Sequence, residues 1–251
     1  MGPVPRSAAT LRDVAPLFRY DDDLLERFPT TRGGVVHVRG AANGASPTAL
    51  ADELAAEQEA ARHRLDGRGP ADLPSIAAWR RAFSAFGVEP TKYRNAAEAL
   101  LRRVVKRGDL PAINLLVDVG NLVSVRHALP VAVFDVARAP GGLVVRTATG
   151  EESFDDLGGT EATRPVPGEV VFVDEDGAVA ARRWCWRQST VHAARLGTTE
   201  ALITVEAHHE GAEEDVAAAL ASFRDLFARH QPSVLVTTAE LSPNRPAFHL
   251  P

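Results

Sequence analysis

The chain has 251 residues, of which 45% are hydrophobic and 24% charged, with a formal net charge of -5. This composition is typical of a globular protein and excludes a disordered, fibrous or membrane-spanning chain. Cys185 is the only cysteine, which excludes an intrachain disulfide and the usual cysteine-ligated zinc site. Residues 1–35 mix charged and apolar side chains, and no apolar stretch of about 18 residues follows, so neither a secretion signal nor a membrane span is indicated. We expect a cytoplasmic protein without a membrane partner.

The first half of the chain carries mainly helical patterns. A strand candidate, Val35–Arg39, comes first, and loops at 40–47 and 66–74 flank the next segment. That segment, Pro47–Leu65, is a predicted helix with Ser46 as its cap and a proline at its first position. Apolar residues at three- and four-residue spacings, with a capping box of Asn95 and Glu98 before one segment, predict three further helices. These are Ser75–Phe86, Asn95–Lys106 and Pro111–Val125.

After His127 the hydrophobic period changes from helical to alternating. Gly and Pro residues separate the alternating segments, and Asp176-Gly177 is a hairpin signal between two of them. A helix with acids in its first turn and cations in its last is predicted at Glu213–Arg229, and Val234–Val236 is a last strand candidate. Helices followed by strands without regular alternation predict an α+β domain. The expected strands are Val131–Val136, Leu143–Thr147, Val170–Asp174, Ala178–Trp186 and Ala201–Ala207.

Two basic segments contrast with the acidic chain as a whole. Residues 79–107 hold eight cations against two acids, and Arg182–Arg195 holds four arginines and no acid, with Trp184, Trp186 and His192 between them. Cations beside aromatic rings suit an RNA backbone with exposed bases, whereas solvated helix faces are the structural alternative. The net negative charge argues against a chain that coats DNA, so we expect no DNA partner. The candidate RNA-binding residues are Arg80, Arg81, Lys92, Arg94, Arg102, Arg103, Lys106 and Arg107.

The sequence lacks the motifs of common catalytic and cofactor chemistry. It has no phosphate-binding glycine loop, dinucleotide fingerprint, nucleophile elbow or metalloprotease motif, and its eight histidines do not fall at metal-ligand spacings. We therefore expect no metal and no other cofactor. Cys185 lies between two tryptophans on a predicted strand, and we interpret it as a buried hydrophobic residue rather than a nucleophile.

Four short motifs follow one another between Leu110 and Ala162: VDVGN, LPVAVFD, GGLVVR and GGTEA. In this order and at this spacing they resemble the editing domain of the phenylalanyl-tRNA synthetase beta subunit, its tRNA-binding B-three/B-four domain. WRRAFSAFGVEPTKYRNAAEALLRRV upstream and RRWCWRQS downstream are more like freestanding versions of that domain. The resemblance spans Trp79 to about His208, and no synthetase catalytic core is recognisable, so it implies a freestanding protein.

The resemblance also implies an architecture. We expect a three-layer α+β domain in which helices flank a mainly antiparallel β-sandwich. All of residues 1–251 would form one domain. Within it we expect an N-terminal strand and helix extension at 1–74, an editing-like, tRNA-binding core at 75–210, and a C-terminal helix and strand at 211–251.

In that family the domain hydrolyses tyrosine wrongly attached to the tRNA for phenylalanine. A glutamate recognises the phenol hydroxyl, and small residues leave room for the ring. By position the resemblance implies Glu161 of GGTEA as this glutamate, Asn121 of VDVGN as a catalytic asparagine, and Gly141 and Gly142 as the glycine pair in the substrate site. Synthetase domains usually carry a histidine where this chain has Ala132. His127, five residues earlier, is the candidate for a partial substitute.

Each of these residues also has a structural interpretation. Glu161 lies in a glycine-rich turn, where a carboxylate is often solvated, and Asn121 can cap its own helix. On a strand over 182–188, alternation places Arg183 and Arg187 on one face, where they contact a ribose or phosphate or form salt bridges. The functional interpretation expects Glu161, Asn121, the glycine pair and the two arginines to meet in one cleft.

Three functions are compatible with these features. The first is a hydrolase that binds aminoacylated tRNA and cleaves the ester of a noncognate amino acid, with a positioned water in place of a protein nucleophile. The second is a catalytically inactive module that binds RNA or an amino acid, which Ala132 at the usual histidine position favours. The third is an unrelated small-molecule role on the same scaffold.

Overall fold

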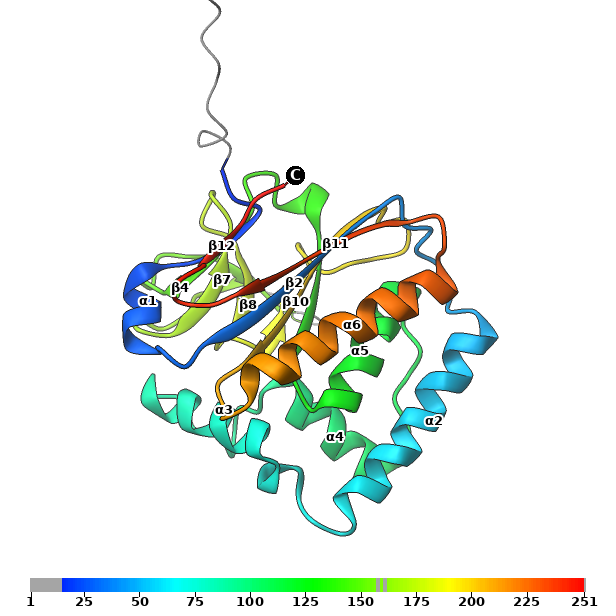
Figure 1. Cartoon of the computed structure of the whole chain (residues 1–251). Helices are drawn as coiled ribbons and strands as arrows, with labels where there is room; N and C mark the ends of the chain where they lie inside the picture. Colours follow the sequence, from blue (N-terminus) through cyan, green and yellow to red (C-terminus); the bar gives the residue numbers. More distant parts are fainter. Residues whose placement is uncertain (1–14, 157–158, 160–161, 251) are drawn as a thin grey trace, which may run out of the picture.

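The computed structural model describes residues 15–156, 159 and 162–250 (Figure 1). Their regular elements alternate little between helix and strand. The helices are α1 (Asp22–Arg27), α2 (Thr48–Leu65), α3 (Pro74–Ala85), α4 (Ala96–Arg107), α5 (Leu115–His127) and α6 (Ala212–His230), with short 3-10 turns at Pro70–Asp72 and Val136–Arg138. The strands are β1 (Phe18–Tyr20), β2 (Arg32–Arg39), β3 (Val131–Asp135), β4 (Leu143–Thr147), β5 (Phe154–Asp155), β6 (Ala162–Thr163), β7 (Val170–Val173), β8 (Val179–Arg182), β9 (Arg187–Gln188), β10 (Glu200–Ala207), β11 (Leu235–Leu241) and β12 (Ala247–Phe248).

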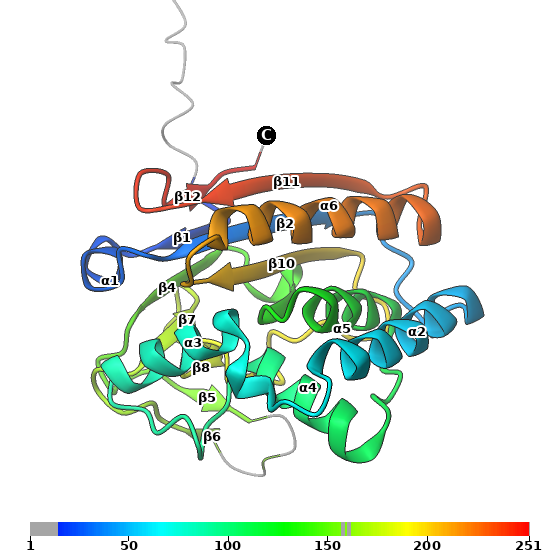
Figure 2. The ribbon, with the colours of Figure 1, turned by 60° about the horizontal axis from the view of Figure 1, so that its bottom comes forward.

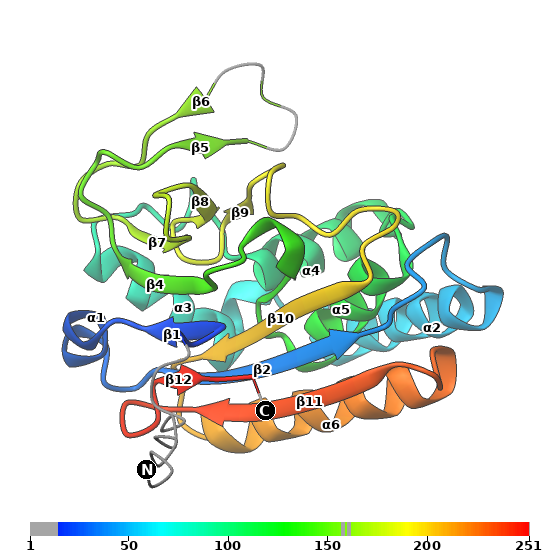
Figure 3. The same ribbon diagram turned by 90° about the horizontal axis from the view of Figure 1, so that it is seen from above.

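Two sheets form the centre of the molecule. The larger has the strand order β12-β1-β4-β7-β8-β9, and the smaller has the order β11-β2-β10-β3. Neighbouring strands run antiparallel except for β1 and β4, which are parallel. A separate β5–β6 hairpin lies beyond the larger sheet (Figure 3). The expected α+β fold with mainly antiparallel strands is confirmed.

Alternation along the strands of the smaller sheet divides its side chains between two cores. In β10, Ala201, Ile203 and Val205 pack on the helical side, while Leu202 packs toward the larger sheet. Helices α5 and α6 cover the helical side, as Figure 2 shows for α6 beside β2 and β10. Because side chains on a strand point alternately to opposite faces, the smaller sheet is buried on both faces. The layers are therefore helices, smaller sheet and larger sheet.

Most predicted elements form near their expected ends. One of the two hydrogen bonds of the predicted capping box is present: the Asn95 side chain accepts from the Glu98 backbone N–H at 2.9 Å. The prediction that a helix opens at Pro111 is wrong, because α5 begins at Leu115 with Asn114 as its cap. Ser46 is not a cap either: its hydroxyl donates to Asp118 at 2.5 Å. No helix within the described part of the chain is long and apolar enough to cross a membrane.

The basic segment predicted as one strand is a tight turn. Strand β8 ends at Arg182 and pairs through that residue with Arg187, so the residues between them reverse the chain. Arg183 and Trp184 both adopt left-handed backbone conformations, with φ of 45° and 61°. Such conformations cost a non-glycine residue about 1 kcal/mol or more. The turn is held because Trp184 is fully buried and its indole N–H donates to Glu206 at 2.9 Å.

Candidate functional site

An apolar pocket of about 430 Å³ opens between α4, α5, β3 and the β8–β9 turn. We call it the Asn121 pocket. It brings together four of the candidate site residues from the sequence: Arg103, Asn121, Ala132 and Arg187. Alanines and larger apolar side chains form most of its wall, and a few polar groups lie among them, a pattern typical of small-ligand sites. The described lining residues are Ala96, Ala99, Leu100, Arg103, Asn121, Val131, Ala132, Ala181, Cys185, Trp186, Arg187 and Gln188.

Asn121 lies in the second turn of α5 with a free side chain. Its helix is capped by Asn114, whose side chain accepts from the Val117 N–H at 3.1 Å, so the capping interpretation of Asn121 is wrong. The Asn121 amide makes no hydrogen bond with any residue that the structure describes. A primary amide offers two N–H donors and one carbonyl acceptor. Asn121 therefore presents unused donors and an acceptor to the pocket.

The other polar groups of the Asn121 pocket are less available. Both ends of the Gln188 amide engage the backbone of Val133, at 3.0 and 3.5 Å. Burial raises the pKa of the Cys185 thiol, so that this group is protonated and a poor nucleophile near neutral pH. No aspartate, glutamate or histidine lines the pocket among the described residues. The visible wall thus supplies shape and hydrogen bonding rather than a general base.

A basic cleft of about 630 Å³ adjoins this pocket. Seven of its ten described lining residues are cationic, and none is acidic. The cleft shares Ala99, Arg103, Trp186 and Arg187 with the Asn121 pocket, so the two cavities have a common wall. The cations of this basic cleft are Lys92, Arg94, Arg102, Arg103, Lys106, Arg107 and Arg187.

Aromatic rings and guanidinium groups pack together at and behind that common wall. The Arg183 guanidinium lies 3.8 Å from the centroid of the Tyr93 ring and 4.4 Å from that of Trp186, and Arg187 lies 4.7 Å from Trp186. Cation–π contacts of this kind are stronger when the cation is desolvated. Only 11% of the Arg183 side chain is exposed, whereas 48% of the Arg187 side chain is. Both arginines also form salt bridges, as their structural interpretation expects: Arg183 lies 4.0 Å from Glu169, and Arg187 donates to Asp156 at 2.5 Å. Arg183 thus supports the aromatic wall, and Arg187, the more exposed of the two, keeps further N–H donors for a ligand.

Glu98 holds three arginines, of which Arg94 and Arg102 are cations of the cleft. It is fully buried, and Arg80 donates to both of its oxygens at 3.0 and 3.1 Å. Arg94 and Arg102 lie 3.7 and 3.6 Å from the same carboxylate. One buried negative charge therefore holds three arginines in place. The exposed cations of the cleft are Lys92, Lys106, Arg107 and Arg187. Arg80 and Arg81 lie on α3 and are absent from its described lining.

Comparison with known proteins bears directly on this pair of cavities. The family model of the B3/4 domain matches residues 78–225, which is more than half of the chain and includes both cavities. The chain belongs to the B3/4 domain family. The motifs VDVGN and LPVAVFD of this B3/4 domain supply Asn121 and Ala132 to one pocket.

The curated relatives that match this chain are longer proteins. The beta subunit of phenylalanine--tRNA ligase from Nocardia farcinica is 42% identical over 81 residues, 32% of this chain and 10% of the relative. The corresponding subunit from Dickeya dadantii is 27% identical over 181 residues, 70% of this chain and 22% of the relative. Among solved structures, an N-terminal fragment of the phenylalanyl-tRNA synthetase beta subunit from Pyrococcus horikoshii aligns with 93% of this chain and 57% of that one, at 11% identity and a TM-score of 0.44. The chain spans about a tenth to a fifth of these curated relatives.

The expected convergence of site residues is only partly correct for this B3/4 domain. His127 faces a different cavity from Asn121, because six residues along an α-helix turn a side chain by about 240°. Gly142 (φ 82°) lies before β4, where an added Cβ atom would stand 2.4 Å from the carbonyl oxygen of Pro16. At Gly141 such an atom would meet the Glu175 carboxylate. The glycine pair therefore allows a close chain crossing and does not line the Asn121 pocket. Glu161 lies outside the described residues.

Sequence reasoning missed Tyr93, Trp186 as a wall residue, and Glu98 as an ionic anchor. The interleaving of aromatic and basic residues was the available signal for the first two. For Glu98 the signal was that it is a single acid among the cations of a helix, but the same position is also explained by a capping box. Its ion pair with Arg80 brings in a side chain from a different helix, α3, and no local pattern specifies that.

Proposed function

We propose that this B3/4 domain binds the acceptor end of an aminoacylated tRNA and hydrolyses the ester of a noncognate amino acid. The RNA occupies the basic cleft, and the aminoacyl group enters the Asn121 pocket. The observation that carries the proposal is the wall shared by the two cavities. A ligand that is anionic at one end and apolar at the other matches this arrangement, and an aminoacyl ester on a terminal ribose has that chemistry.

The cleft suits single-stranded RNA for physical reasons. Phosphates are neutralised by exposed cations such as Lys106 and Arg107, and the Trp186 ring offers a face on which a base or ribose can pack. Arg187 reaches both cavities. It is therefore placed to hold a phosphate or ribose at the junction.

Hydrolysis in this pocket relies on water rather than on a protein nucleophile. The water oxygen forms a bond to the ester carbonyl carbon, and the bond from that carbon to the ribose oxygen breaks. The ribose oxygen leaves with a proton from the water, giving the free amino acid and uncharged tRNA. Asn121 orients the water or donates to the carbonyl oxygen, and a positioned amide donor of this type contributes about 10²-fold or more to the rate.

The alternative function is a binding module that retains both cavities without catalysis. Its support is specific: alanine stands at position 132, and the described lining of the Asn121 pocket contains no general base. Such a protein would bind charged tRNA and leave its ester intact.

The two functions separate in one experiment. The purified protein is mixed with tRNAs charged with different labelled amino acids, and ester loss is timed against the spontaneous rate. The hydrolase predicts accelerated loss for at least one aminoacyl group, reduced about 10²-fold in Asn121→Ala and unchanged in Arg39→Ala. Arg39 is an exposed arginine on β2, outside both cavities.

Binding without acceleration for any aminoacyl group would select the binding module. If neither binding nor acceleration occurs with any tRNA, the proposal of an aminoacyl-tRNA site is wrong.

A further inference from the structure

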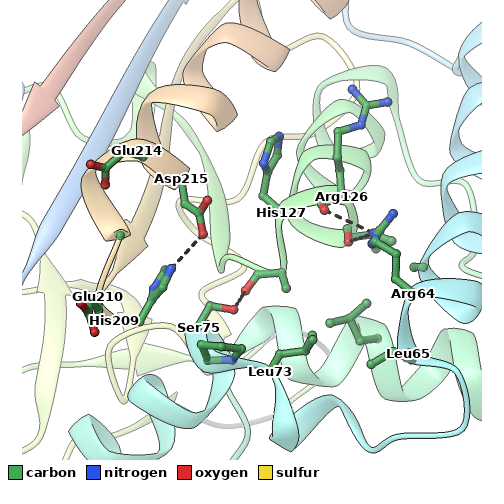
Figure 4. Close-up of a pocket in the computed structure, with 16 residues that line it drawn as sticks. Arg64, Leu65, Leu73, Ser75, Arg126, His127, His209, Glu210, Glu214 and Asp215 are labelled. Atoms are coloured by element: carbon green, nitrogen blue, oxygen red, sulfur yellow. Dashed lines mark hydrogen bonds and ion pairs between the residues drawn. The ribbon is translucent and has the colours of Figure 1, made fainter.

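A third cavity, of about 700 Å³, lies where α2, α3, α5 and α6 meet (Figure 4). We call it the His127 cavity. Its volume lies within the range of about 300–1,000 Å³ usual for small-ligand sites. It shares helix α4 with both of the other cavities and helix α5 with the Asn121 pocket, but none of its described lining residues belongs to the Asn121 pocket or to the basic cleft. It has therefore no part in the function proposed above.

The charges around the His127 cavity are separated. Asp215, Glu214 and Glu210 approach it from the start of α6, and Arg64 approaches from the end of α2. Figure 4 shows Arg64 and Asp215 on opposite sides, with His127 between them and Leu65 and Leu73 below. An acidic rim and a basic rim with an apolar floor between them complement a molecule that has charges of opposite sign at its two ends.

The acidic rim is organised by a buried imidazole. His209 Nε2 lies 2.8 Å from Asp215 Oδ2, and only 7% of the His209 side chain is exposed, against 51% of Asp215. The imidazole N–H occupies one carboxylate oxygen and orients the group, while the second oxygen can accept from a ligand ammonium. Glu214 adds an exposed carboxylate one residue away.

The basic rim carries a positive charge that the protein does not fully neutralise. Arg64 and Arg126 share a single carboxylate, Glu57, at 2.8 Å each. Arg64 also donates to the backbone carbonyls of Val125 and Arg126, at 2.9 and 3.3 Å. A guanidinium has five N–H donors, so these three bonds leave donors for a carboxylate, and 46% of the Arg64 side chain is exposed.

His127 keeps the middle of the cavity uncharged. Its Nε2 lies 2.9 Å from the Ser222 hydroxyl oxygen, and burial, followed by the charge of Arg126, lowers the pKa of His127. Near neutral pH the imidazole is therefore neutral. A polar but uncharged group between two charged rims suits the amide of a peptide bond better than a third charge.

We propose that the His127 cavity binds a short peptide with free termini, its ammonium at Asp215 and Glu214 and its carboxylate at Arg64. A free α-amino acid carries both charges on one carbon, whereas Figure 4 shows the two rims on opposite sides of the cavity. Each residue of a peptide extends the span by about 3.5 Å, so a di- or tripeptide with an apolar side chain engages both rims and covers the Leu65 and Leu73 floor.

The test is isothermal titration of the full chain with glycyl-leucine, N-acetyl-glycyl-leucine, glycyl-leucinamide and free leucine. The proposal predicts that glycyl-leucine binds at least tenfold more tightly than each of the other three. Asp215→Asn and Arg64→Gln should each weaken glycyl-leucine binding about tenfold. Glu213→Gln, on the same helix turn but outside the cavity lining, should leave it unchanged.

Glu214→Gln supplies a second test, since this exposed side chain makes no hydrogen bond or ion pair with the residues that the structure describes. Circular dichroism checks the fold of each variant. Equal binding of all four compounds would show apolar capture and overturn the proposal, as would no binding of glycyl-leucine. Loss of binding in Ala132→Trp, which fills the Asn121 pocket, with no loss in Asp215→Asn would also overturn it.

Discussion

Glu206 is a carboxyl group enclosed by aromatic side chains. It is 2% exposed, and the Tyr20 hydroxyl and the Trp184 indole donate to its Oε1 at 2.8 and 2.9 Å. Burial raises the pKa of Glu206 from 4.5 to about 7, although both hydrogen bonds act to lower it. The folded protein therefore binds a proton that the unfolded chain releases above about pH 4.5.

This pKa predicts the direction of a stability change. Because the folded pKa exceeds the unfolded one, the free energy of unfolding falls as the pH rises from about 4.5 to 7 and is level above that range, a change of about 3 kcal/mol from this group. Glu206→Gln keeps a neutral acceptor, so its stability relative to wild type should increase between pH 5 and 8. Urea unfolding at several pH values checks this, and a constant difference would contradict it.

His208 gives the opposite dependence from the same core. Neither of its ring nitrogens has a hydrogen-bond partner within the described structure. The centroid of its ring lies 4.4 Å from that of Trp79 and 4.8 Å from that of Trp184. Burial, with a smaller effect of His209, lowers the pKa of His208 from 6.5 to about 3. The folded state thus holds a neutral imidazole that the unfolded chain protonates below about pH 6.5.

The consequence is acid sensitivity. Since the folded pKa is depressed, stability from this group is present above about pH 6.5 and is lost as the pH falls toward 3, by up to about 5 kcal/mol. His208→Phe should remove much of this loss between pH 6.5 and 4, which thermal melts at fixed pH values can follow. A variant whose melting temperature falls as steeply as that of wild type would refute the assignment.

At the scale of elements, the position of α4 depends on one buried ion pair network. Glu98 on α4 joins α3 through Arg80 and joins the preceding loop through Arg94. Glu98→Gln should lower the free energy of unfolding by about 3 kcal/mol, the low end for a buried pair, because the arginines can reach water. Glu26→Gln, an exposed acid on α1, is the matched control and should change it by less than about 0.5 kcal/mol. Equal effects in chemical denaturation would contradict the network.

Elements with strong local signals were predictable from the sequence, and those that depend on tertiary contacts were not. The Asn95 cap, the periodicity of α3 and the acidic first turn of α6 each act within a few residues. By contrast, β1 and β12 are too short to show a period. They form by pairing, β12 with β1 and β1 also with β4. The turn at 183–186 alternates like a strand, but the burial of Trp184 beside Glu206 reverses the chain there.

At the scale of the whole molecule, positive charge is concentrated in the basic cleft although the chain has a net charge of -5. The basic cleft was foreseeable because its cations are close in sequence. The Asn121 pocket was foreseeable only in part. Asn121 and Ala132 belong to the neighbouring motifs VDVGN and LPVAVFD, whereas Arg187 is brought to the pocket by the turn between β8 and β9. The separation of His127 from Asn121 follows from helical geometry, which sequence proximity alone conceals.

The cleft predicts salt-dependent RNA binding. Each cation that contacts a phosphate releases counterions, so Lys106→Ala and Arg107→Ala should each reduce the slope of log affinity against log salt by about one. Arg39→Ala should leave the slope unchanged. Fluorescence anisotropy with an uncharged tRNA at several salt concentrations measures these slopes, and identical slopes in all three variants would place the RNA elsewhere.

The shared wall of the two cavities is tested most directly by one ratio of affinities. A tRNA carrying its amino acid through a stable amide at the terminal ribose is compared with the same uncharged tRNA, so that hydrolysis does not interfere. We predict that the wild-type protein binds the charged form at least tenfold more tightly for some amino acid. In Ala132→Trp this preference should disappear while affinity for uncharged tRNA stays the same. Equal affinity of the wild-type protein for both forms, across the amino acids tested, would contradict the account.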